Sequence, residues 1–392
     1  MKYDFDRIIN RENTNAIKWD PVVLKEMFGS EDLLPLWVAD MDFLCPQPVI
    51  DALTQRAQHG IFGYSAPASD YYDAIINWNK KRNNWEIRKE WFVYTPGVVP
   101  ALNFMLQTFS NPGDKVIIQN PVYYPFANSI RKNGRQPVFS QLLFEDKKYK
   151  MDFEDIERKV KDPLVKLFIL CSPHNPVGRV WTKEELIELG EICFDNDVLV
   201  ISDEIHSDLI LKGNKHTPFT GISDKFAENS IVCTAPSKTF NLAGLQLSNI
   251  FIPNDKLRQN FQQTMMRNSL TRPNAFAITA TTAAYNDGEE WLEQLLEYLN
   301  ETVLFIEDFI KKEMPEVGFI KPEGTYLGWL DFRGIEGDEK ILEKIMHEKA
   351  KVALDEGYIF GKGGEGFERI NFACPRSLVD KTLRRIKTAI SR

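Results

Sequence analysis

The 392-residue chain lacks any apolar run as long as the roughly 18 to 20 residues that cross a membrane. Its N-terminal residues also lack the apolar core of a secretory signal. Positive charge is not in excess, because 48 Lys and Arg stand against 56 Asp and Glu, for a net charge of −8. Since phosphate backbones require a positive footprint, the sequence predicts neither a nucleic acid nor a membrane as a partner.

Cysteine is also scarce. The five cysteines are dispersed without a C-x-x-C pair, which argues against a disulfide framework or a zinc site, and we predict no metal. Reduced, mostly buried thiols of this kind are typical of a cytoplasmic protein. With 43% hydrophobic and 12% aromatic residues, the chain can bury a large core, which excludes disorder as its dominant state.

The chain does contain an alternation of strand and helix patterns. Its continuous apolar runs are typical of strands that are buried on both faces of a mostly parallel sheet. Between two of these runs, Thr182 and Glu185 indicate a capping box at the start of a helix. The alternation predicts an α/β fold. The predicted strands cover 115–119, 166–172, 198–202, 230–235 and 247–252.

Two domains are expected. A large domain over 46–287 holds the parallel sheet and its flanking helices. A smaller α+β domain combines an N-terminal arm, 1–45, with 288–392. Other predicted elements are helices at 46–57, 69–82 and 377–392, two long helical stretches after about 253 that are interrupted near 286–288, and strands at 324–332 and 368–374.

Polar residues follow the predicted strands at the edge where open parallel sheets bind their ligands. Asn175, Asp203 and Lys238 each come after one of the runs, and Gly97 makes a turn into a helix whose N-terminal N–H groups suit a phosphate. A pyridoxal phosphate enzyme requires this set, because a lysine bonds the cofactor aldehyde and an acid keeps the ring nitrogen protonated. The order of these residues therefore predicts a cofactor site.

Each residue also has an ordinary structural interpretation. Lys238 alone is a surface lysine, and Asp203 alone is a helix N-cap. Asn175 before Pro176 is a turn residue, and His206 is a core histidine. Their order and their shared placement at strand ends favour the cofactor site over four separate explanations.

The motifs SPHNPVG, SDEIH and APSKTFNLAGL, in this order and at these separations, resemble the fold-type-I superfamily of pyridoxal phosphate aminotransferases. The segments PLWVADMDF, GIFGYS, TPGVVPAL and RINFACPRS narrow the resemblance to the MalY/PatB branch of cystathionine β-lyases. The resemblance extends from about Phe5 to the C-terminus. It implies pyridoxal 5′-phosphate as cofactor and a small amino acid as substrate. The implied reaction cleaves cystathionine or a related cysteine S-conjugate to a thiol, pyruvate and ammonia.

The resemblance also assigns roles to the matching residues. Lys238 is the lysine that bonds the cofactor and then acts as the base, Asp203 partners the ring nitrogen, and Asn175 donates to the ring oxygen. Tyr123 stacks on the ring, and Arg369 binds the substrate α-carboxylate as a bidentate clamp. The remaining cofactor contacts are the backbone of Gly97, Val98 and Val99, the Ser237 side chain, and His206.

Two positions depart from the wider superfamily. His206 stands where aminotransferases often carry Tyr, and Gln246 stands where many place a phosphate-binding Arg. Both argue against a standard aspartate-type aminotransferase. The motifs do not separate elimination from transamination, so an aminotransferase for aromatic or other apolar amino acids is an alternative. A cofactor-binding protein with a mainly regulatory, protein-contacting role is a third possibility.

A homodimer with active sites at the subunit interface is expected, because the aromatics of the arm would otherwise face water. The resemblance places Tyr64 at the partner's cofactor phosphate, against a plain turn-flanking role. Trp37 and the Ala39 backbone are candidates for the leaving-group end of the pocket, although Trp37 also suits simple core packing. GKGGEG, 361–366, is interpreted as a flexible loop leading to Arg369, since it does not lie between a strand and a helix start.

Overall fold

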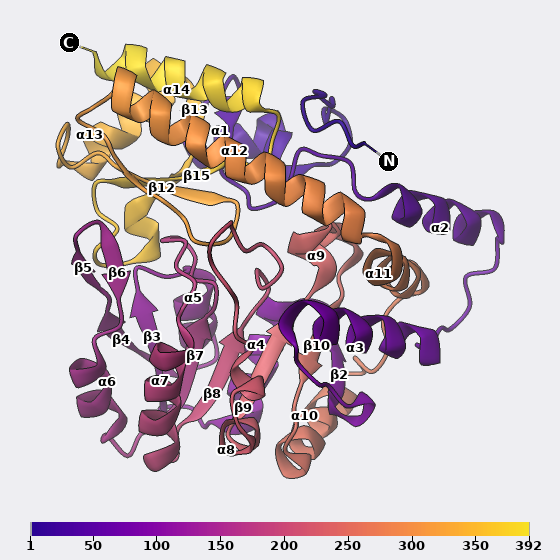
Figure 1. Ribbon diagram of the computed structural model, residues 1–392. Helices are drawn as coiled ribbons and strands as arrows, with labels where there is room; N and C mark the ends of the chain where they lie inside the picture. The colour runs from indigo at the N-terminus through magenta and orange to yellow at the C-terminus, as the bar shows by residue number, and fades with distance from the viewer. Residues whose placement is uncertain (1, 392) are drawn as a thin grey trace.

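The computed structural model describes residues 2–391. Its centre is a seven-stranded sheet in the order β2-β10-β9-β8-β7-β3-β4 (Figure 1). Strand β10 is antiparallel to both of its neighbours, and the other neighbours pair in parallel. The predicted mostly parallel sheet is confirmed. Its strands are β2 (Phe92–Thr95), β3 (Lys115–Asn120), β4 (Gln136–Gln141), β7 (Val165–Cys171), β8 (Leu199–Asp203), β9 (Ser230–Thr234) and β10 (Ser248–Phe251).

The sheet is buried on both faces, as its continuous apolar runs predict. Along β7, Leu167 and Ile169 belong to one core cluster, whereas Phe168 and Leu170 belong to the other. This alternation follows from the two-residue period of a strand. One cluster includes α4 (Val98–Phe109), α5 (Pro125–Lys132) and α10 (Asp255–Arg267), and the other includes α6 (Phe153–Val160), α7 (Lys183–Asp195) and α8 (Asp224–Glu228).

Several helices lie where the sequence predicts them. Thr182 and Glu185 form the predicted capping box at the start of α7, and the helices predicted at 46–57 and 69–82 are α2 (Gln47–Gln58) and α3 (Ser69–Asn83). The region after residue 253 differs, because three helices replace the two predicted stretches: α10, α11 (Ala275–Asp287) and α12 (Glu289–Glu313). Strands β2 and β4 were also missed, since both are only partly buried.

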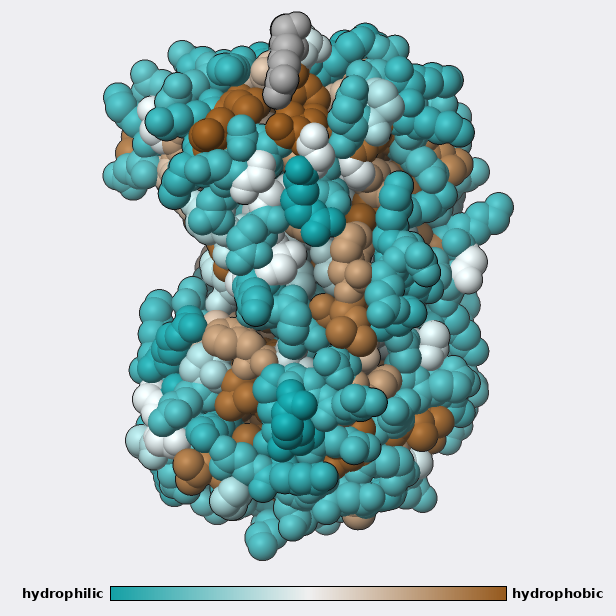
Figure 2. Space-filling view, turned by 90° about the vertical axis from the view of Figure 1, so that its left-hand side faces the viewer, coloured by the Kyte–Doolittle hydropathy of each residue, from teal (hydrophilic) through white to brown (hydrophobic). Residues whose placement is uncertain are grey.

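A second sheet lies above the first in Figure 1, beneath α12 and α14 (Arg376–Ile390). Its four antiparallel strands run in the order β11 (Gly318–Ile320), β12 (Leu327–Asp331), β15 (Phe367–Asn371) and β14 (Asp355–Glu356). Helix α13 (Glu339–Lys344) continues into a π-helical turn, Ile345–Ala350. The space-filling view shows two lobes with an indentation between them (Figure 2). The exact division at 45/46 and 287/288 stays a prediction.

The N-terminal segment is not the exposed arm that the sequence predicted. It contains a helix, α1 (Pro21–Phe28), and its β1 (Leu34–Pro35) pairs in parallel with β13 (Val352–Ala353) of the small domain. Leu36, Trp37, Met41 and Phe43 are buried within the single chain. The argument for a dimer from exposed arm aromatics is therefore wrong, because the chain covers these side chains itself.

The other elements connect these layers. They are β5 (Leu143–Glu145), β6 (Lys148–Lys150), the short α9 (Pro236–Thr239) after β9, and several single turns of 3₁₀ helix. Within residues 2–391, no helix is long and apolar enough to cross a lipid bilayer. Cys45, Cys171, Cys193, Cys233 and Cys374 are all free thiols.

Candidate active site

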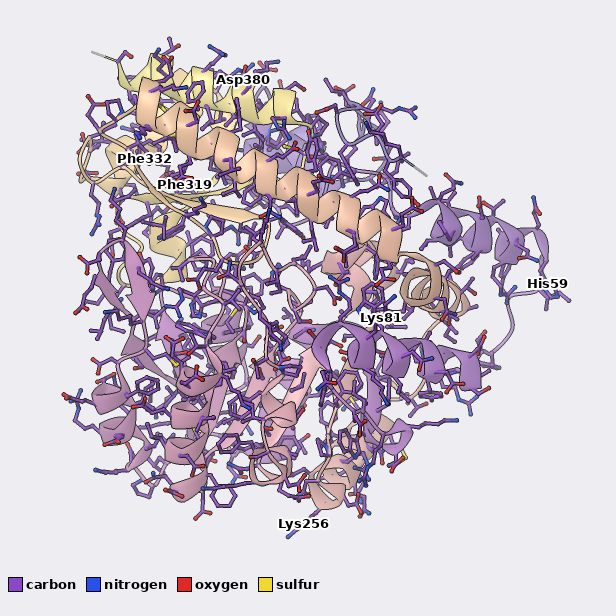
Figure 3. All side chains as sticks on the ribbon, in the orientation of Figure 1. His59, Lys81, Lys256, Phe319, Phe332 and Asp380 are labelled. Atoms are coloured by element: carbon purple, nitrogen blue, oxygen red, sulfur yellow. The ribbon has the colours of Figure 1, made fainter. Side chains whose placement is uncertain are left out.

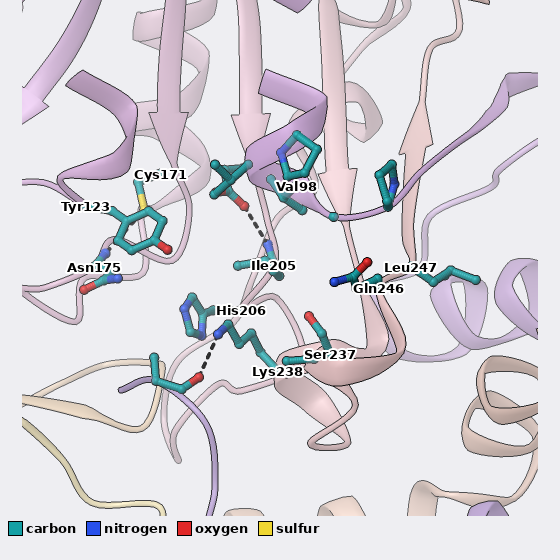
Figure 4. A pocket seen from close by; sticks show the side chains of 17 residues that line it. Val98, Tyr123, Cys171, Asn175, Ile205, His206, Ser237, Lys238, Gln246 and Leu247 are labelled. Carbon is teal, nitrogen blue, oxygen red and sulfur yellow. Dashed lines mark hydrogen bonds between the residues drawn. The ribbon is translucent and has the colours of Figure 1, made fainter. Parts of the chain in front are cut away.

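A cavity of about 220 Å³ lies at the carboxyl edge of the seven-stranded sheet (Figure 4). The segments that follow β2, β3, β7, β8 and β9 all reach this edge, because these strands run in one direction. The fold thus brings Lys238 and Ala39, which are 199 positions apart in the sequence, into contact. The predicted residues that line the cavity are Ala39, Gly97, Val98, Val99, Tyr123, Asn175, Asp203, His206, Ser237 and Lys238.

Lys238 lies on α9, directly after β9, and its amine points into the cavity. Its Nζ donates a hydrogen bond of 2.7 Å to the Ala39 carbonyl oxygen. Burial lowers the Lys238 pKa to about 8; the Asp40 charge opposes this shift and the Arg369 charge adds to it. A sizeable neutral fraction at neutral pH follows, and the neutral amine is the form that attacks a carbonyl.

Asp203 is the last residue of β8 and is only 5% exposed. Burial raises its pKa to about 7, although the Ile205 N–H donates to Oδ1 at 3.2 Å and the nearby Lys238 charge favours the ionised form. A carboxylate held this far from water needs a positive partner to stay ionised. A protonated pyridine nitrogen in the cavity would be such a partner.

His206 is buried beside Lys238, with its ring edge-on to Tyr326 at 5.8 Å between centroids. Its Nδ1 atom is buried and has no hydrogen-bond partner among residues 2–391. Burial lowers the His206 pKa to about 3, so the ring is neutral. An unpaired buried ring nitrogen at a cavity wall is expected where a ligand supplies the partner. Together with Lys238 and Asp203, it fits a pyridoxal ring.

The N-terminus of α4 borders one end of the cavity, where the sequence predicts a phosphate. Gly97 precedes this helix at φ +155° and ψ 162°, a backbone conformation that residues other than glycine rarely adopt. The first N–H groups of a helix have no partner within the helix and favour an anion. Val98, Val99 and Ser237 lie around this end, and Gln246 borders it.

Arg369 reaches the site from β15 of the small domain and is 3% exposed. Its Nη1 donates to the Asn175 Oδ1 and its Nη2 to the Trp37 carbonyl oxygen, each at 3.0 Å. Nη2 also forms an ion pair with Asp355, and Nε is buried without a partner. The guanidinium is therefore held on several sides and keeps N–H groups for a further acceptor.

Asp355 is a site residue that the sequence reasoning missed. Burial raises its pKa to about 6, and the Arg369 charge opposes that shift. It lies on the two-residue strand β14, which carries no hydrophobic period. No motif marks it, and only its cross-strand pairing with Arg369 reveals it.

Two asparagines fix the arm against the site. The Asn371 Nδ2 donates to the carbonyl oxygens of Val38 and Asp40, both at 2.6 Å. Asn241, three residues after Lys238, accepts from the Met41 N–H at 3.1 Å. The carbonyl of Ala39 is thereby held in place for Lys238 and for the Tyr326 hydroxyl, which donates to it at 2.8 Å.

Trp37 does not line the leaving-group end with its side chain, which corrects the expectation from the sequence. Its ring packs edge-on against Phe28 at 5.2 Å and belongs to a small core with Leu24 and Leu33. The indole N–H donates a hydrogen bond of 3.3 Å to the Lys18 carbonyl oxygen. Only the Trp37 backbone carbonyl reaches the site, through Arg369.

Tyr64 also lies apart from the cavity of its own chain. It is fully exposed in the segment between α2 and α3, close to Phe62, Gln246 and Arg272. The loop at 361–366 precedes β15, so it is not a phosphate loop. It is closely packed, because a Cβ on Gly361 would lie 2.6 Å from the Asn120 Nδ2.

Comparison with known proteins agrees with this geometry. The family model "Aminotransferase class I and II" matches residues 31–386. Cystathionine β-lyase PatB of Bacillus subtilis (strain 168) is 47% identical over 388 residues, which cover 99% of this chain and all of that protein. The chain belongs to the class I and II aminotransferase family.

Two solved structures are similar over their whole length. Cystalysin from Treponema denticola, which contains pyridoxal 5′-phosphate, is 39% identical with a TM-score of 0.96, covering 99% of both chains. A pyridoxal phosphate-bound C–S lyase from Staphylococcus hominis is 36% identical with a TM-score of 0.94, covering 100% of this chain and 99% of that one. The predicted fold class and family are confirmed.

Proposed function

We propose that the protein is a pyridoxal phosphate-dependent C–S β-lyase that cleaves cystathionine or a related cysteine S-conjugate to a thiol, pyruvate and ammonia. The observation that carries the proposal is the convergence of Lys238, Asp203 and Asn175 on one cavity, with Arg369 hydrogen-bonded to Asn175 beside it. Full-length similarity to a cystathionine β-lyase and to a C–S lyase structure supports elimination over amino transfer.

The residues for the cofactor are in place. Lys238 would bond it, Asp203 would pair with its ring nitrogen and Tyr123 would cover its ring. The N-terminus of α4 and Ser237 would hold the phosphate. When bound, pyridoxal phosphate supplies an aldehyde that bonds amines and an electron-poor ring that stabilises negative charge at the attached carbon.

The protein's own residues then bind the substrate and move protons. Arg369 holds the α-carboxylate through its remaining N–H groups, with Asn175 fixing the guanidinium. Released from the cofactor, the Lys238 amine accepts the proton from Cα, since its pKa of about 8 suits a base at neutral pH. Loss of that proton permits the β-thiolate to leave.

An assay of products tests the reaction. The purified holoenzyme should release pyruvate from cystathionine, and the Lys238→Ala variant should release none above background. Amino transfer to a keto acid should be slow under the same conditions. Brisk transfer without pyruvate would establish the aminotransferase alternative, and turnover no faster than that of free pyridoxal phosphate would favour a non-enzymatic role.

We further propose a homodimer in which Tyr64 completes the site of the partner. The segment 60–65 supports this, because Ile61 is 68% and Phe62 is 57% exposed while Tyr64 contacts little of its own chain. Mixing inactive Lys238→Ala and Tyr64→Ala subunits should restore one intact site per hybrid dimer. No recovery, although both variants dimerise and exchange, would reject the shared site. A cytoplasmic location is proposed on the five free thiols.

A further inference from the structure

A second group of chemically reactive side chains lies in the small domain, outside the cofactor cavity. Glu343 of α13, His347 of the π-helical turn and Glu356 of β14 each offer one ligand atom, and these atoms lie within 4.8 Å of one another. The His347 Nε2 is 3.2 Å from the Glu356 Oε1. His347 is buried, with an edge-on contact to Phe28 at 5.1 Å. Turns of π-helix are rare and occur frequently at functional sites.

A fourth residue, Glu368 of β15, points to a ligand at this place. It is only 2% exposed, and within residues 2–391 its carboxyl group has neither a hydrogen bond nor an ion pair. It stands directly opposite Glu356 in the antiparallel pair β14–β15, so both carboxyl groups lie on one face of the sheet.

The same pair of strands separates this group from the substrate site. Side chains alternate between the two faces of a strand. Asp355 and Arg369 therefore occupy the face toward the cofactor cavity, while their neighbours Glu356 and Glu368 occupy the opposite face. Two like charges side by side in a buried position are costly unless a proton or a cation lies between them.

We propose that Glu343, His347 and Glu356 bind one divalent transition-metal ion in the small domain, beside the buried carboxyl group of Glu368. One imidazole nitrogen with carboxylate oxygens is a ligand set that suits Zn²⁺ or a neighbouring first-row ion. The cation would neutralise the carboxylates and give Glu368 the partner that it lacks. The sequence prediction of no metal rested on cysteine spacing and did not weigh this set, because its members come from three separate elements.

One residue competes with the metal. The Lys340 amine donates to the Glu343 Oε2 at 2.8 Å, while 67% of the Lys340 side chain remains exposed. The Tyr358 hydroxyl also lies 3.4 Å from that oxygen. Exposed pairs of this kind are weak because water screens them, so the lysine would give way when a metal binds.

Binding can be measured directly on the holoenzyme. After chelator treatment, Zn²⁺ is titrated by calorimetry into wild type, His347→Ala, Glu368→Gln and the control His59→Ala. Figure 3 shows His59 at the outer end of α2, far from Phe319 and Phe332 of the small domain. Wild type and His59→Ala should bind one equivalent per chain. The two site variants should bind at least roughly 10-fold more weakly, because even the substitution of a residue that only surrounds the ligands lowers metal affinity by about that factor.

A second measurement keeps the outcome clear if a variant folds poorly. Lys340→Ala should bind Zn²⁺ more tightly by roughly 2- to 5-fold, because a competing cation is removed from Glu343. Equal binding by wild type and His347→Ala, or an unchanged affinity in Lys340→Ala, would overturn the proposal.

Discussion

The sheet edge that carries Lys238 and the arm that closes over it are built in different ways. At the sheet edge, Asp203 and Lys238 are placed by the ends of regular parallel strands, and in the proposed reaction their side chains would supply the chemistry. In the arm, an irregular backbone is fixed by Asn371 and Asn241, and its carbonyl groups do the positioning. The first arrangement is encoded by side-chain identity at strand ends, whereas the second depends on tertiary hydrogen bonds.

The largest effect should come from the sheet edge. Lys238→Ala should lower kcat/KM for pyruvate release by at least roughly 10⁴-fold, because it removes both the covalent attachment and the proton-accepting amine. Borohydride reduction should label the wild type on the peptide that contains Lys238. The control Lys256→Ala changes a lysine in the first turn of α10, at the bottom of the view in Figure 3, and should be fully active. Labelling of another lysine would reject the assignment.

A substitution in the arm should lower the stability of the protein rather than change the reaction that it catalyses. Trp37→Ala leaves a cavity beside Phe28 and Leu24 and should lower the free energy of unfolding by about 3–5 kcal/mol. The folded variant should keep the wild-type ranking of cystathionine, cystine and other conjugates, since the ring does not line the cavity. Urea unfolding and steady-state kinetics check both statements. A changed ranking of the substrates, with little loss of stability, would instead mean that the Trp37 side chain contacts the leaving group.

The difference between the sheet edge and the arm explains which site residues could be predicted from the sequence. Asn175, Asp203 and Lys238 were predicted from strand ends, because continuous apolar runs mark buried parallel strands and their carboxyl ends share one edge. The resemblance added the roles of Arg369 and of the further phosphate contacts Val98, Val99 and Ser237. Asp355 could not be predicted, and the sequence left the burial of Trp37 as one of two interpretations, since both depend on the pairing of short strands, β14 with β15 and β1 with β13.

Within the sheet edge, Asp203 should make stability depend on pH. Its pKa is about 7 in the folded protein and near 3.8 when unfolded, so the folded state holds its proton more tightly. Stability from this group is therefore present at low pH and is lost as pH rises through the window from about 4 to about 7. In the cofactor-free protein, Asp203→Asn should gain roughly 2–4 kcal/mol over wild type between about pH 4 and pH 8.

Urea unfolding of both cofactor-free proteins across that range measures the difference. With pyridoxal phosphate bound, the gain should shrink, because a positive ring nitrogen would then partner the Asp203 carboxylate. Parallel pH profiles for the variant and the wild type would mean that Asp203 is already paired within the protein, which contradicts its role as the partner of the cofactor ring.

The smallest of these effects should arise where the two regions meet, at Arg369. Removing its contact to the α-carboxylate should cost at least about 2 kcal/mol, roughly 30-fold in kcat/KM, on every substrate alike. Arg369→Ala also leaves Asp355 buried without its partner, which would favour a protonated Asp355 and a loss of stability. The double variant Arg369→Ala/Asp355→Asn separates the two losses, because it removes the stranded carboxyl charge but not the substrate defect. If the double variant regains both stability and kcat/KM, Arg369 acts as the counter-ion of Asp355 and not as the clamp of the substrate.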